Sequence, residues 1–131
     1  GRGQRFVHTG DDARMQEIRR HWDNGQRARA FGLYWASMYG HVLDLIEQDD
    51  HLRNAILFVR YEDLCKQPYE TFARMLAHAE LEDNRSDAAM AQRLDAVKAP
   101  DYYRAELTPD EAIELETATR DIAQRLGYRT Q

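Results

Sequence analysis

The stretch that most constrains this chain is a continuous apolar run that ends in a charged and aromatic tetrad. Residues 55–59 read Ala-Ile-Leu-Phe-Val, and the tetrad Arg60–Asp63 follows directly. A short run of branched and aromatic residues bounded by polar ones is typical of a strand buried on both faces. Polar groups that follow such a strand lie at its C-terminal edge, where open α/β sheets bind ligands. The sequence therefore predicts an α/β fold with one central parallel strand, over about residues 55–60.

Most of the remaining sequence has helical periodicity. Apolar residues recur three or four positions apart, and turn or cap residues separate the periodic segments. The predicted helices cover Ala13 to about Trp22, about Gln26 to Gln48, Pro68 to about Glu80, and Ser86 to about Val97. A polar link that begins at Asp49–His51 is expected to connect the second of these helices to the strand. The chain is therefore expected to be mostly α-helical around its strand.

The last predicted helix has the strongest local signature. Thr108, Pro109 and Glu111 occupy the N-cap, the first and the third helical positions, which is a capping box with the preferred proline. Gly127 can adopt the left-handed conformation that ends helices, and Tyr128 follows as the expected apolar contact. We expect a helix between these two signals.

Composition limits the function classes. The 131 residues are 43% hydrophobic and carry a net charge of −5 with no long basic block. A general nucleic-acid or anionic-membrane surface is therefore not expected. Cys65 is the only cysteine, which favours a reducing, cytoplasmic setting, and the histidine spacing predicts no metal site. We expect a flexible tail or cut end over residues 1–10 and a single domain over residues 11–131.

The order of these motifs resembles the second half of sulfotransferases that use 3′-phosphoadenosine-5′-phosphosulfate (PAPS). The resemblance rests on the following segments: Leu33 to Leu45, Ile56 to Leu64, Pro68 to Leu81, and Tyr103 to Tyr128, the last as in bacterial members. It implies the C-terminal part of a P-loop-like α/β fold with a parallel sheet. It also implies transfer of a sulfuryl group from PAPS, as donor substrate, to an acceptor hydroxyl or amine.

The resemblance assigns candidate binding residues. Tyr61 would line the adenine pocket, although it can equally pack under the next helix. Lys98 or Arg104 could contact the 3′-phosphate, although single basic residues are more often solvated. The neighbours of Tyr61 are expected to be structural, with Arg60 pairing with an adjacent carboxylate.

The sequence departs from the family in one major respect. It contains no Gly-rich phosphosulfate loop with Lys and Ser/Thr, and it offers no catalytic base. The expectation is therefore an inactive adenine-side half, whose strand a missing N-terminal half or another chain would cover. The alternative is a non-catalytic helical interaction or oligomerisation module, which would expose apolar surface. The sequence identifies neither the acceptor nor the oligomeric state.

Overall fold

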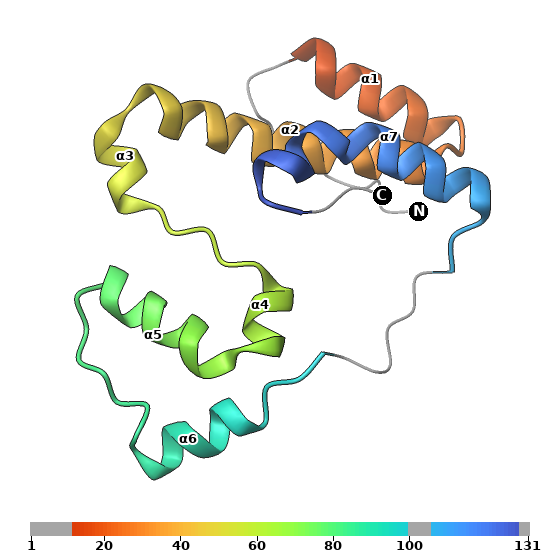
Figure 1. Cartoon of the computed structure of the whole chain (residues 1–131). Coiled ribbons are helices and arrows are strands. Elements are labelled where there is room, and N and C mark those ends of the chain that lie inside the picture. The colour runs from red at the N-terminus through yellow and green to blue at the C-terminus, as the bar shows by residue number, and fades with distance from the viewer. Residues whose placement is uncertain (1–11, 100–105, 129–131) are drawn as a thin grey trace. The chain divides into compact units, whose positions relative to one another are not determined.

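The computed structural model of the chain describes residues 12–99 and 106–128, and these residues form seven α-helices (Figure 1). The helices are α1 (Asp12–Asp23), α2 (Arg27–Gln48), α3 (Asp50–Ala55), α4 (Tyr61–Lys66), α5 (Pro68–His78), α6 (Ala88–Asp95) and α7 (Pro109–Arg125). They divide into two compact units, and the division between Leu52 and Arg53 falls within α3. The first unit contains α1, α2 and α7, and the second contains α4, α5 and α6. The predicted tail over residues 1–10 lies outside the described part of the chain.

The predicted central strand is wrong, and so is the α/β class built on it. Residues 12–99 and 106–128 contain no strand and no sheet. Ala55 ends α3, and the residues that follow are non-helical up to Arg60, whose backbone is extended at φ −78° and ψ 136°. A strand is defined by backbone pairing with a neighbour. Residues 56–59 have no such hydrogen bond to another described residue, because the surrounding segments satisfy their own backbones as helices.

Three further boundaries differ from the prediction. The expected polar link forms α3, because the Asp49 carboxylate accepts hydrogen bonds from the backbone N–H groups of His51 at 2.8 Å and Leu52 at 3.3 Å. The residues after the predicted strand form a helix of their own, α4, rather than a turn. The N-cap of α6 is Asp87 instead of Ser86, and its carboxylate accepts from the Ala89 N–H at 3.0 Å. Short acidic caps therefore decided the starts of α3 and α6, whereas α4 begins after Arg60 without a side-chain cap.

The capping box predicted for the last helix is confirmed. The Glu111 N–H donates to Thr108 Oγ1 at 3.3 Å, and the Thr108 N–H donates to Glu111 Oε2 at 2.9 Å. At the other end Gly127 has φ +81°, and the Tyr128 N–H donates to the Ala123 carbonyl at 2.9 Å. This is the left-handed stop that the sequence predicts. The boundaries of α7 are therefore fixed locally at both ends.

The core of the first unit lies between α1 and α2. The two helices form a hairpin whose turn contains Gly25, at φ +81°. Met15, Ile18 and Ala30 are buried against one another. The larger side chains of Trp22, Leu33 and Tyr34 are half-buried and pack around this cluster. The apolar stripes predicted for the first two helices thus face each other, as the hydrophobic effect requires.

Helix α7 lies against α2 and runs in the same direction (Figure 1). A Cβ added at Gly32 would lie 2.8 Å from the Ala118 Cβ, and one added at Gly40 would lie 3.1 Å from the Ile122 Cδ1. Near the end of both helices, Arg125 bonds two carboxylates of α2, at 3.0 and 2.7 Å. Gly32 therefore allows close helix approach at the cost of low helix propensity, whereas Gly40 faces only the flexible end of Ile122.

Helix α5 is the centre of the second unit, since both α4 and α6 pack against it. Its buried side chains are Thr71 and Leu76, and α6 contributes the buried Leu94. Pro68 stands at its first turn, as predicted.

None of the helices in the described part of the chain is both long enough and apolar enough to span a membrane.

We predict that alanine substitutions at the two α2 glycines have opposite effects. Gly32→Ala places a methyl group against the rigid Cβ of Ala118, so it should lower the free energy of unfolding by about 1–3 kcal/mol. Gly40→Ala meets only the rotatable end of Ile122, so it should raise that free energy by about 0.5 kcal/mol through helix propensity. Urea unfolding followed by circular dichroism measures both.

The two variants control for each other, because each adds the same methyl group to the same helix. An unchanged or raised midpoint for Gly32→Ala would contradict the close approach at Gly32, and a lowered midpoint for Gly40→Ala would show that Ile122 cannot move aside.

Candidate functional site

The first candidate site is the start of α4, where the Arg60–Asp63 ion pair spans the first turn. Arg60 is the N-cap residue, and its guanidinium donates from Nε and Nη2 to the Asp63 carboxylate, at 2.7 and 2.8 Å. Two parallel charge-assisted hydrogen bonds fix the relative orientation of the two groups. They also hold the pKa of Asp63 below its ordinary value. The expected pairing of Arg60 with a neighbouring carboxylate is therefore present, and it selects Asp63.

The same turn is attached to α5. The Asp63 carbonyl accepts from the Thr71 hydroxyl at 3.1 Å and from the Gln67 N–H at 2.8 Å. Thr71 is only 2% exposed, so its hydroxyl needs this partner. Gln67 is at once the C-cap of α4 and the N-cap of α5. The joint between the two helices is thus one residue long and fully hydrogen-bonded at Asp63.

Tyr61 lies in the sequence between Arg60 and Asp63, the two residues of the ion pair. It is the first residue of α4 and is 55% exposed. An exposed aromatic ring on a fixed turn can stack on a planar ligand. The following helix therefore leaves more than half of the Tyr61 surface exposed, and does not bury it.

Of the other two predicted binding residues, the structure describes only Lys98. Lys98 is exposed after the end of α6 and makes no hydrogen bond or ion pair with another described residue. Its ammonium group is therefore not hydrogen-bonded to Tyr61. Arg104 lies outside the described residues. Tyr61 thus lies on a hydrogen-bonded turn, and Lys98 is exposed.

A second polar cluster joins α5 to α6. The Tyr69 hydroxyl donates to Asp95 Oδ1 at 2.8 Å, and this hydrogen bond raises the pKa of Tyr69. Arg85 donates to Asp83 at 2.6 and 2.8 Å and to the Tyr69 carbonyl at 3.2 Å. The Arg85 hydrogen bonds lower the pKa of Asp83 to about 2. Every charged group of this cluster has a partner, so its role is structural.

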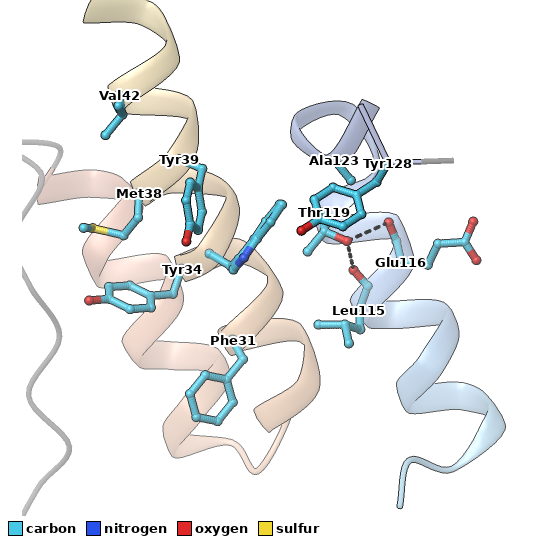
Figure 2. A pocket seen from close by; sticks show the side chains of 11 residues that line it. Phe31, Tyr34, Met38, Tyr39, Val42, Leu115, Glu116, Thr119, Ala123 and Tyr128 are labelled. Carbon is cyan, nitrogen blue, oxygen red and sulfur yellow. Dashed lines mark hydrogen bonds between the residues drawn. The ribbon is translucent and has the colours of Figure 1, made fainter. Parts of the chain in front are cut away.

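Sequence reasoning missed the second candidate site, a groove between α2 and α7. Its volume is about 1060 Å³. The lining residues come from the two helices and the chain just after α7: Phe31, Tyr34, Trp35, Met38, Tyr39, Val42, Leu115, Glu116, Thr119, Ala123 and Tyr128. Figure 2 shows the labelled α2 side chains and those of α7 on the two sides. The periodicity of α2 indicated an apolar stripe, but it assigned the whole stripe to the core.

The groove is apolar and aromatic, with little unsatisfied polarity. The Thr119 hydroxyl donates to the Leu115 carbonyl at 2.9 Å (Figure 2). Glu116 pairs with Arg120 at 3.0 Å. The rings of Tyr39 and Trp35 are in tilted contact, with centroids 4.9 Å apart and an interplanar angle of 46°. A surface of this kind favours apolar or planar partners over charged ones.

Within residues 12–99 and 106–128, no three His, Cys, Asp or Glu side chains converge as a metal-binding group would require.

No protein-family model matches the sequence, and no curated protein or solved structure is significantly similar to it.

We predict an acid-dependent contribution from the Asp83–Arg85 pair. The folded pKa of Asp83, about 2, lies below its ordinary 3.8. A carboxyl shifted downward stabilises the fold above its unfolded pKa, and this contribution is lost as the pH falls through the folded pKa. Asp83→Asn should therefore lower the melting temperature at pH 6, and the difference from wild type should shrink between pH 4 and pH 2.

The matched control is Glu82→Gln, the neighbouring carboxylate, which has no hydrogen-bond or ion-pair partner among the described residues. Its difference from wild type should not follow this profile. A pH-independent effect of Asp83→Asn would contradict the assignment.

Proposed function

We propose that this chain binds the adenosine end of PAPS as part of a sulfotransferase. The single observation that carries the proposal is the Tyr61 turn. The sequence that resembles the sulfotransferase motif, Arg60 to Leu64, forms a hydrogen-bonded helix start that presents an exposed tyrosine. The resemblance assigns the adenine-lining role to this same residue. Support therefore comes from a motif and from a local geometry that suits the role of the motif.

The chemistry of the turn suits a purine. The Tyr61 ring can stack on or flank the base, and its hydroxyl can hydrogen-bond a ring nitrogen. Lys98, exposed and solvated, can reach for a phosphate oxygen through a charge-assisted hydrogen bond. Arg104 is the other candidate for the 3′-phosphate. These residues bind the part of the donor that leaves with the phosphoadenosine product.

Residues 1–131 contribute donor binding and no transfer step. They contain no Gly-rich loop to cradle the phosphosulfate and no candidate base. In the complete reaction an acceptor hydroxyl or amine would attack sulfur in line while cationic groups stabilise the leaving phosphoadenosine. Because residues 1–131 lack the Gly-rich loop and a candidate base, the chain should bind nucleotide and leave PAPS intact.

We expect the chain to bind adenosine 3′,5′-bisphosphate, the product nucleotide, and to lose affinity when the ring of Tyr61 is removed. Tyr61→Ala should weaken binding by about tenfold or more, because stacking of an aromatic side chain on a base is lost. Tyr61→Phe keeps the ring and should retain most of the affinity. Isothermal titration calorimetry measures the three dissociation constants.

Tyr39→Ala is the matched control, because Tyr39 is also an exposed tyrosine, at 40%, but lies in the other unit. It should bind like wild type. Equal affinity of the wild type and Tyr61→Ala, or no binding by either, would overturn the assignment of Tyr61.

A second candidate function is favoured by the groove between α2 and α7. Phe31 is 45% exposed and Tyr39 is 40% exposed, so a wide aromatic face meets solvent. Contiguous apolar surfaces of this kind often mark protein–protein contacts. A second copy of the chain offers the same face, so a symmetric pair would bury both grooves. In this reading the chain is a helical oligomerisation module with no catalytic role.

Sedimentation equilibrium tests this second candidate. A dimer should form, and Tyr39→Glu should raise its dissociation constant by about tenfold or more by burying a charge. His41→Glu is the control, because His41 is exposed on α2 and does not line the groove. A monomer at all concentrations, or equal weakening by both variants, would exclude the groove as the dimer contact.

A further inference from the structure

The geometry points to Arg60, Asp63 and Thr71 as positioning residues that hold Tyr61 in place for the nucleotide. This inference rests on the proposed function, because it takes Tyr61 as the residue that meets the base. It adds a device that acts through Tyr61 and does not itself touch the ligand. Asp63 is the central member, because it is hydrogen-bonded through both its side chain and its carbonyl.

The side-chain half of the device spans Tyr61. The Arg60 guanidinium and the Asp63 carboxylate are joined by two hydrogen bonds at 2.7 and 2.8 Å, one on each carboxylate oxygen. The Arg60 carbonyl also accepts from the backbone N–H groups of Asp63 and Leu64, each at 3.1 Å. A closed loop of bonds therefore surrounds the backbone of Tyr61. Because the pairing is bidentate, a lysine at position 60 could not reproduce it.

The carbonyl half of the device attaches the turn to α5. Thr71 is buried, and its hydroxyl reaches the Asp63 carbonyl at 3.1 Å. A buried anchor limits tilting of α4, whose six residues are too few for a helix that is stable alone. Preorganisation of this kind raises affinity, because the ligand does not have to order the site.

The same unit supplies a matched comparison. Arg85 and Asp83 form an equivalent bidentate pair, at 2.6 and 2.8 Å, but it is attached to the Tyr69 carbonyl. Both pairs are partly exposed and are joined over similar distances, 2.7 and 2.6 Å at the closest atoms. Replacing either Asp63 or Asp83 by asparagine removes one negative charge from the second unit. Only the Arg60–Asp63 pair encloses Tyr61, so only its loss should affect the nucleotide.

The test measures two quantities on the same variants of the whole chain. Asp63→Asn and Arg60→Lys should speed amide hydrogen exchange at residues 63 and 64, and should weaken adenosine 3′,5′-bisphosphate binding by about threefold. Asp63→Glu keeps the carboxylate and should recover part of both losses. Asp83→Asn should leave both quantities unchanged. Circular dichroism checks that each variant is folded.

The outcomes separate the two proposals. If the wild type binds no nucleotide, the proposed function fails, and amide exchange at residues 63 and 64 still decides whether the pair orders the turn. If the wild type binds but Asp63→Asn and Asp83→Asn lose affinity equally, the positioning role is overturned and the proposed function stands. Unchanged exchange and unchanged affinity in Asp63→Asn and Arg60→Lys would also overturn it.

Discussion

The close approach of α2 and α7 is the contact on which the first unit depends. Gly32 leaves no room for a Cβ beside Ala118, so the two helices touch through backbone and small side chains. The helices are distant in sequence and run in the same direction, which a short hairpin loop cannot achieve. Residues 53–105 are therefore an insertion between two helices that belong together. The tight contact also determines which side chains of α2 are left to line the groove.

The second unit is held by polar joints as much as by its small core. Thr71, Leu76 and Leu94 are its buried side chains, while the Arg60–Asp63 pair and the Tyr69–Asp95 hydrogen bond connect its helices. Individual surface pairs contribute little stability, but they restrict geometry. A unit built in this way can keep a short helix, and the tyrosine at its start, in a fixed conformation.

The longer helices α1, α2, α5, α6 and α7 could be predicted because their signals are local. The Thr108–Glu111 capping box and the stop at Gly127 set α7 through contacts within a few residues of each end. The pairing of Arg60 with an adjacent carboxylate could be predicted, because it depends on neighbours along the chain. The binding role of Tyr61 comes from the family resemblance and stays a prediction. The groove did not follow, because α2 carries one continuous apolar stripe and periodicity cannot divide it between core and surface.

The sequence by itself determined the five longer helical segments, both ends of α7 and the pairing of Arg60 with an adjacent carboxylate. Tertiary structure decided what the apolar run at residues 56–59 becomes. An apolar, β-prone segment is a strand only when another backbone pairs with it, and the described neighbours are helices with satisfied backbones. Tertiary structure also decided that α7 joins α2 through Gly32, because complementarity between distant surfaces leaves no mark in a local pattern.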